Sequence, residues 1–382
     1  MNADSAFICV TLSSDRRSSI MVSGHHASSK TLERNFFETM NYRDSDTRNR
    51  SLAVGLILLL TIAAALITYK TTAALAVIQS TQKSGTFRPR PGVFPLSNNT
   101  LQPNALQRSF NYFLIVAPAL IFGILLSGTV RVLMSPELWS RLMGTGFFRP
   151  QLIAGAAGIP LMLCSCCAAP IFSSMYERSS RVGPPLATIL AAPSLNPFAL
   201  LLTFMLFGSH FGIVRAIVAV LTVFLTPALV ERVFRTRLTA CPVDREETKQ
   251  STVVALLQSW FRVAVRTVPL ILFGVLISMF IAEWLPIGAF NSTTSKVVLT
   301  IVIALIAVPL AMPTFFEIPL ALILLSAGAP PAAALAMLIA GPAINLPSLL
   351  TIGYATNWKV AGTVALSVFL LALFGSLLVG IF

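Results

Sequence analysis

Nine long apolar segments constrain this chain more than any other feature. The first runs from Leu52 to Tyr69, and eight more follow at approximately 110–134, 150–173, 184–207, 212–231, 260–284, 297–325, 331–354 and 359–382. Several of them approach or exceed the roughly 20 residues that a helix needs to cross a bilayer. Charged residues make up only 11% of the 382 residues, against roughly 25% in soluble domains. The sequence therefore predicts an all-α, polytopic helical protein, multi-pass in the cell (inner) membrane.

Polar stretches divide the chain between these segments. Residues 1–50 are rich in Ser, Arg, Asn and Asp and are expected to form a disordered polar tail. The predicted order after the tail is an N-terminal transmembrane helix over 51–80, a Pro-rich linker over 81–107, a membrane repeat over 108–231, a charged loop over 232–257 and a second membrane repeat over 258–382. The net charge of +13 lies mostly in loops beside apolar segments, where it meets lipid headgroups. It does not indicate a nucleic-acid partner.

The second group of four segments repeats the first at a shift of 149 residues. The matched pairs are Pro160 with Pro309, Pro170 with Pro319, Pro193 with Pro342, and Asn196 with Asn345. A proline in a helix interior removes a backbone hydrogen bond, so each of these prolines is predicted to mark a helix break. Duplicated units with matched breaks are typical of secondary transporters. The repeats are parallel if all four segments of each cross the membrane and inverted if one is re-entrant, and the sequence leaves both open.

Three cysteines lie close together in the first broken region. Cys164, Cys166 and Cys167 stand between Pro160 and Pro170. A nearby helix N-terminus would favour the thiolate form, and thiolates bind soft species such as Cu(I), zinc or trivalent arsenic. A single buried cysteine is often only a small apolar residue. The cluster instead predicts a substrate-binding thiol site, with no permanently bound metal.

Four polar residues and one acidic residue accompany the cysteines at the breaks. Glu317 stands in an apolar segment, where a carboxylate is a functional-site hypothesis by default; burial would favour its protonated form and suit proton coupling. The alternative is that Glu317 lies at the aqueous end of its helix. Ser165 and Thr314 occupy corresponding positions and are predicted to supply hydroxyls to the substrate. Asn196 and Asn345 are predicted either to satisfy freed backbone groups or to face the substrate.

At LCSCCAAPIF (163–172), APSLNP (192–197) and AGPAINLPSLL (340–350), the chain resembles the ArsP-like predicted-permease family. That family includes bacterial efflux permeases for trivalent organoarsenicals, and the resemblance covers roughly residues 108–382. It implies a permease in which Cys164 and Cys166 match the family's Cys-x-Cys. Family members often have Gly where this chain has Cys167.

These observations favour a proton-coupled secondary transporter that exports a thiophilic solute, such as a trivalent organoarsenical or another metalloid or soft metal species. The alternative is a membrane thiol–disulfide oxidoreductase, which would be expected to carry cysteines in both halves. The second half has Phe315 and Phe316 where the first has Cys166 and Cys167. A non-transporting membrane scaffold is a third possibility. The sequence contains no Walker A, GxSxG or HExxH pattern, so we predict no enzyme activity and no cofactor.

Overall fold

The structure is a computed structural model, and it describes residues 29–84, 105–133, 146–178, 181–234, 252–283 and 296–380. The chain divides into two compact units, Met1–Ile57 and Leu58–Phe382. The described part of the first unit is the beginning of the long helix α1 (Ser29–Ser84), and the second unit contains the rest of α1 and all other elements. Every element of the described residues is a helix. The all-α fold predicted from the sequence is therefore confirmed.

The helix α1 is longer than the predicted transmembrane helix over 51–80. It begins at Ser29, so residues 29–50 are helical and do not belong to the predicted disordered tail. This stretch contains neither Gly nor Pro, and a helix that the apolar span has already nucleated extends without a new nucleation cost. Residues 1–28 of the tail, 85–104 of the linker and 235–251 of the charged loop lie outside the described residues.

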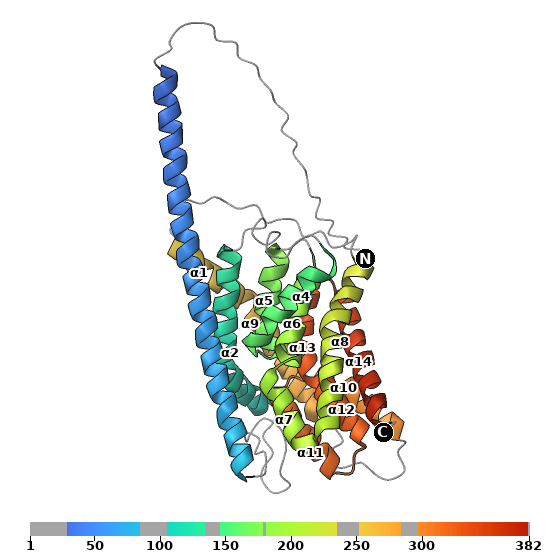
Figure 1. The fold of residues 1–382 in the computed structure, drawn as a ribbon. Coiled ribbons are helices and arrows are strands. Elements are labelled where there is room, and N and C mark those ends of the chain that lie inside the picture. Colours follow the sequence, from blue (N-terminus) through green and yellow to red (C-terminus); the bar gives the residue numbers. More distant parts are fainter. Residues whose placement is uncertain are drawn as a thin grey trace. The chain divides into compact units, whose positions relative to one another are not determined.

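From Ala105 onward, two sets of helices follow one another with the same order of long and short elements (Figure 1). The first set comprises α2 (Ala105–Leu133), α4 (Phe148–Gly158), the 3-10 turn η1 (Ile159–Leu161), α5 (Ser165–Arg178), α6 (Gly183–Ser194), α7 (Pro197–Phe207) and α8 (Ser209–Phe234). The second comprises α9 (Thr252–Glu283), α10 (Lys296–Ala307), α11 (Glu317–Ser326), α12 (Pro331–Ala343), α13 (Leu346–Ala355) and α14 (Trp358–Gly380). This order is the one that a duplicated unit would have, and the duplication itself stays a prediction.

Only some of these elements can cross a bilayer. Six described stretches are long and apolar enough, namely parts of α1, α2, α8, α9 and α14 and the continuous pair α6 and α7. The pair α12 and α13, bent by 43° at its break, makes a seventh. By contrast, α4 and α5 have 11 and 14 residues and α10 and α11 have 12 and 10. Each is shorter than the roughly 20 residues that a span requires.

The elements α4, η1 and α5 form a re-entrant hairpin. Arg181, which follows α5, donates through Nη1 to the carbonyl of Gly146 at 2.8 Å and through Nη2 to that of Phe147 at 3.2 Å. These two residues precede α4, so the chain leaves the hairpin on the side where it entered. Glu231, near the end of α8, pairs with Arg181 and accepts a hydrogen bond from Gln151 at 2.8 Å. The helix α8 therefore ends on the same side, which we call the Arg181 side.

The re-entrant hairpin decides how the two sets are oriented. Three crossings, by α2, by α6 with α7 and by α8, bring the chain back to the side of the membrane on which α2 ends. The helix α9 therefore starts on that side and runs in the opposite direction to α2. The contacts agree: near the start of α9, Trp260 and Ser259 donate to the carbonyls of Leu125 and Gly128 near the end of α2, both at 3.0 Å. The sequence left a parallel and an inverted arrangement open, and the geometry favours the inverted one.

Four of the six prolines predicted as helix breaks stand at or beside a break. Pro160 lies in η1, and Pro309 lies in the irregular segment between α10 and α11. Pro193 and Pro342 are each the last residue but one of their helices, α6 and α12, just before the chain bends.

The other two prolines do not break a helix, which corrects the prediction for them. Pro319 lies in the first turn of α11, where a missing N–H removes no intrahelical bond. Pro170 lies inside α5, and its carbonyl accepts a hydrogen bond from Ser127 at 2.7 Å. Its missing N–H leaves the carbonyl four residues earlier without a helical donor, yet α5 continues to Arg178.

Labelling with a membrane-impermeant maleimide tests the hairpin. In a variant with all five native cysteines replaced by serine, Gly146→Cys and Asn357→Cys should react from one side of the membrane and Ser209→Cys from the other, because only α6 and α7 cross between residues 146 and 209. A hairpin segment that crossed the membrane would place Gly146→Cys and Ser209→Cys on the same side. That result would contradict the inverted arrangement.

Candidate functional site

The three predicted cysteines form one buried cluster. Their side chains are 5%, 0% and 0% exposed for Cys164, Cys166 and Cys167, and all are free thiols. The Cys164 sulfur lies 3.1 Å from that of Cys166 and 2.9 Å from that of Cys167, and the last two are 3.9 Å apart. Three sulfurs this close can bind one soft ion or atom together.

The cluster stands at the N-terminus of α5. The Cys164 carbonyl accepts hydrogen bonds from the backbone N–H groups of Cys167 and Ala168, both at 3.0 Å, so Cys164 occupies the cap position. Met162 before it has a left-handed backbone, with φ of 49°, which turns the chain sharply out of η1. As a result, Cys166 and Cys167 lie in the first helical turn, where the helix dipole favours negative charge. Ser165, the first residue of α5, is also buried.

The helix α2 forms a wall beside the thiols. Tyr112 is fully buried, and its hydroxyl lies 3.4 Å from the Cys166 sulfur. Gly123 approaches the cysteine backbone so closely that a β-carbon there would lie 2.4 Å from the Cys167 carbonyl oxygen. One turn further, Ser127 bonds to the Pro170 carbonyl. The position of the cluster therefore depends on close packing between α2 and α5.

A cation from α1 acts electrostatically on this cluster. Lys70 is within electrostatic range of the Cys164 thiol, and its ammonium donates to the Thr314 hydroxyl at 3.4 Å. Thr314 belongs to the break before α11, so Lys70 connects the thiol site with the second broken region. Lys70 follows directly after the predicted apolar segment Leu52–Tyr69, and α1 continues beyond it to Ser84.

Glu317 is not beside the thiols but in a buried ion pair. It is the first residue of α11 and 3% exposed, and its Oε1 accepts a hydrogen bond from Arg215 Nη2 at 2.9 Å. Arg215 on α8 is equally buried and also donates to the hydroxyl of Thr203 on α7. The carboxylate therefore lies inside the protein and not at the aqueous end of its helix.

The two predicted asparagines cap half-helices. Asn196 Oδ1 accepts hydrogen bonds from the N–H groups of Phe198 and Ala199 at the start of α7. Asn345 Oδ1 accepts from the Ser348 N–H at 3.1 Å, and the Ser348 hydroxyl accepts from the Asn345 N–H, which completes a capping box. Both amides thus satisfy freed backbone groups. The Asn196 amide nitrogen is buried and has no hydrogen-bond partner among the described residues.

The second broken region meets the break after α12. The Pro309 carbonyl accepts from the N–H of Leu346, at the start of α13, and from the hydroxyl of Ser278 on α9, both at 3.1 Å. The Ser278 hydroxyl also contacts the Ala311 N–H. Two breaks far apart in sequence therefore lie side by side in the second set of helices.

Lys70 and Arg215 are the site residues that sequence reasoning missed. Both stand inside apolar stretches long enough to span a membrane, at Gly55–Lys83 and Ser209–Phe234. The rule that singled out Glu317, that a charge within such a stretch is functional by default, applies to them equally. The rule does not show that Arg215 pairs with Glu317, because the two residues are 102 positions apart in the sequence.

Comparison with known proteins identifies the family of this chain. The ArsP_1 family, described as a predicted permease, matches residues 104–381. The chain belongs to this family of predicted permeases. The match includes the cysteine cluster, Arg215 and Glu317, whereas α1 and Lys70 lie outside it. The protein is thus a membrane permease with an N-terminal helix beyond the part that matches the family.

Individual relatives resemble different lengths of the permease. The UPF0718 protein YraQ of Escherichia coli (strain K12) is 29% identical over 270 residues, which cover 69% of this chain and 78% of YraQ. The UPF0718 protein MJ0584 of Methanocaldococcus jannaschii is 27% identical over 119 residues, or 31% of this chain and 33% of the relative. The UPF0718 protein YcgR of Bacillus subtilis (strain 168) is 29% identical over 97 residues, or 25% and 33%. No solved structure matches the chain significantly.

Substitution at Gly123 tests how closely α2 holds the cysteine cluster. We expect Gly123→Ala to lower the free energy of unfolding by about 1–3 kcal/mol, the usual cost of overpacking, because the new methyl group would collide with backbone. Thermal unfolding of the purified permease in detergent measures the effect. Gly362→Ala on α14 is the matched control, since a β-carbon there meets no atom within 4 Å. Equal stability of the two variants would contradict the packing described here.

Proposed function

We propose that this permease is a proton-coupled secondary transporter that exports a trivalent arsenical or a similar thiophilic solute from the cell. The observation that carries the proposal is the cluster of three free, buried sulfurs at a helix break. Membership in a predicted permease family supports transport. Cys164, Cys166 and Cys167 would bind the solute, and the Ser165 and Thr314 hydroxyls would lie along its path.

The sulfur spacing suits a small, soft central atom. If each sulfur lies about 2.3 Å from one atom, as in thiolate–metal sites, the sulfurs are roughly 3–4 Å apart. The observed separations of 2.9, 3.1 and 3.9 Å are close to this range. Little rearrangement of the cysteine backbone would then be needed for binding.

The number of thiols bears on which arsenical is bound. Each arsenic–sulfur bond replaces one hydroxyl of the solute, which leaves as water with the thiol proton, and no electron is transferred. Methylarsonous acid has two hydroxyls and needs two thiols, whereas arsenite has three and uses three. Cys164 and Cys166 would suffice for the organoarsenical. Cys167 supplies the third bond that arsenite requires.

The ion pair between Glu317 and Arg215 suits proton coupling. A buried carboxylate whose partner is a fixed arginine is stable when charged, and protonation would break the pair. Arg215 also lines a small cavity of about 10 Å³ with Ser194 and Thr222, about enough for one water molecule. Such a water would give protons a route to the pair.

The proton site and the thiol site share one short segment. Thr314 contacts Lys70 beside Cys164, and three residues later Glu317 contacts Arg215. Phe315 between them has a left-handed backbone, with φ of 73°. Because this conformation is strained for a bulky residue, the segment is suited to change shape. Protonation of Glu317 would release one end of it and alter the surroundings of the thiols at the other.

The oxidoreductase alternative has less support. Residues 258–382 contain no cysteine in the sequence, and Phe315 and Phe316 stand at the positions that correspond to the thiols. Electron relay across the membrane would need a redox group in that half. We therefore argue for transport alone.

Binding of two arsenicals to the purified, reduced permease tests the thiol site. Cys164→Ser and Cys166→Ser should weaken binding of both methylarsonous acid and arsenite by at least about tenfold, or roughly 1.4 kcal/mol. Cys167→Ser should weaken arsenite binding alone, because only arsenite needs the third sulfur. Isothermal titration calorimetry gives the affinities and the stoichiometry.

A double variant, Cys9→Ser with Cys241→Ser, is the control, since both cysteines stand far from residues 164–167 in the sequence and binding should not change. Failure of the wild type to bind either arsenical, with its thiols shown to be reduced, would separate this permease from arsenic chemistry. Equal losses of both arsenicals in Cys167→Ser would contradict the coordination argument while leaving a thiol site in place.

Glu317 and Arg215 variants test proton coupling. Arg215→Gln leaves a buried carboxylate unpaired and should destabilise the protein by about 3–5 kcal/mol, whereas Glu317→Gln combined with Arg215→Gln should recover part of that loss. In proteoliposomes, Glu317→Gln should still bind arsenical but should not respond to an imposed pH gradient. Uptake by Glu317→Gln with an unchanged pH dependence would contradict the role of Glu317 as the proton carrier.

A further inference from the structure

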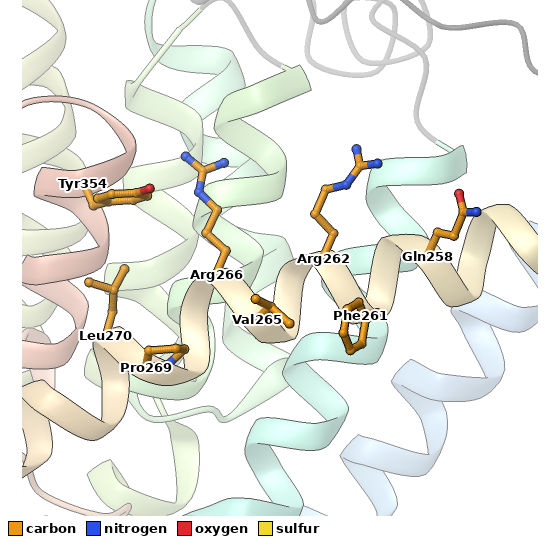
Figure 2. A pocket seen from close by; sticks show the side chains of 8 residues that line it. All are labelled: Gln258, Phe261, Arg262, Val265, Arg266, Pro269, Leu270 and Tyr354. Carbon is orange, nitrogen blue, oxygen red and sulfur yellow. The ribbon is translucent and has the colours of Figure 1, made fainter.

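An open groove runs along the first half of α9, away from the thiol site. Its volume is about 840 Å³, and seven of its eight lining residues come from α9, with Tyr354 of α13 at one end. Gln258, Arg262 and Arg266 follow one another at intervals of four and so share one face of the helix. Figure 2 shows their polar ends pointing to the same side of α9. The groove therefore has one polar edge.

Positive charge at this edge is not fully neutralised. Glu177 accepts a hydrogen bond from Arg266 at 2.5 Å and pairs with Arg131 at 2.8 Å, so one carboxylate serves two arginines. The Arg266 guanidinium also lies 5.1 Å from the centroid of the Tyr354 ring. Arg262 is exposed and forms no ion pair with any described residue. The edge thus carries an excess positive charge that an anion would offset.

The rest of the groove is apolar. Phe261 and Val265 are 72% and 56% exposed, and Pro269 and Leu270 continue the apolar surface toward the centre of α9. These residues belong to a helix stretch that is long and apolar enough to span a bilayer. A ligand that fits must therefore present a negative group to the arginines and a long apolar part to the membrane. A phospholipid with an anionic headgroup has this form.

The location of the groove agrees with such a lipid. Arg266 contacts Glu177 near the end of α5, which places the polar edge on the Arg181 side. Among the described residues from α2 to α14, basic residues near helix ends gather on that side. They are Arg131, Arg149, Arg181, Arg232, Arg262, Arg266 and Lys359, against Arg108, Arg215 and Lys296 on the other side. The positive-inside rule then makes the Arg181 side cytoplasmic, where anionic lipids give the leaflet its negative potential.

We propose that this groove is a binding site for an anionic phospholipid. The phosphate lies against Arg262, with Arg266 at its edge, and an acyl chain lies over Phe261 and Val265. Because Arg266 also pairs with Glu177 at the end of α5, a bound lipid contacts the outer end of the re-entrant hairpin through one residue. The site is independent of the thiols and of the ion pair at Glu317.

Native mass spectrometry of the permease from detergent micelles containing phosphatidylglycerol or phosphatidylcholine tests the site. The wild type should retain phosphatidylglycerol in preference to phosphatidylcholine. Arg262→Gln should lower retention of phosphatidylglycerol about fivefold, equivalent to the roughly 1 kcal/mol that one basic side chain contributes near an anionic surface. Val265→Trp should lower it as well, because the larger side chain fills the apolar part of the groove.

Arg149→Gln is the matched control, because Arg149 is an exposed arginine on the same side but on α4, outside the groove. Among the described residues Arg262 has no ion-pair partner, so its substitution should leave the thermal unfolding midpoint unchanged. A shifted midpoint would contradict the absence of such a partner. Equal retention of phosphatidylglycerol by Arg262→Gln and Arg149→Gln would overturn the proposal. Equal retention of the two lipids by the wild type would also overturn it. A dimer that dissociates only in Arg262→Gln would assign the groove to a second copy of the chain instead of a lipid.

Discussion

Helix breaks inside a membrane free backbone groups that have no water to bond, and this structure depends on how those groups are satisfied. Ser278 of α9 bonds to the Pro309 carbonyl in the break before α11, and Ser127 of α2 bonds to the Pro170 carbonyl inside α5, the helix that follows the first break. Asn196 and Asn345 cap the half-helices that follow the other two breaks. These bonds allow helix N-termini to exist within the bundle. The thiols at α5 and the carboxylate at α11 both stand at such N-termini, so the chemistry of the site follows from the breaks.

Buried charge in this permease is better explained by function than by stability. A buried ion pair such as Arg215–Glu317 is weak evidence for stabilisation, because desolvation offsets much of the attraction between its members. A pair of apolar residues would fill the same space at lower cost. The pair also connects α8 of the first set of helices with α11 of the second. Because the Arg215–Glu317 pair is costly and joins the two sets of helices, it suits the switch between two conformations that the proposed transport function requires.

Local signals in the sequence predicted the thiol site well and the charged contacts poorly. Three cysteines within four positions must be neighbours in any fold, and prolines beside them indicated the break. Arg215 and Glu317 are 102 residues apart, and Lys70 and Thr314 are 244 apart, so only the folded chain brings them together. Pro170 shows the opposite error, since a proline alone indicates a break, but α5 continues through Pro170 to Arg178.

The additional helix α1 gives this permease a contact that the family match does not contain. Lys70 reaches Thr314 and lies beside Cys164, yet it precedes the first matched residue. A thiolate inside a membrane carries a desolvation cost unless a positive charge lies nearby, and we propose that Lys70 supplies that charge for Cys164. Under the proposed function, a thiolate at Cys164 would lose its negative charge on bonding to arsenic, because the displaced hydroxide takes up a proton and leaves as water, and the attraction of Lys70 for this sulfur would fall. Lys70 would then turn more fully toward Thr314, whose segment ends at Glu317. In this way, binding at the thiols and protonation of Glu317 would act on opposite ends of the segment from Thr314 to Glu317.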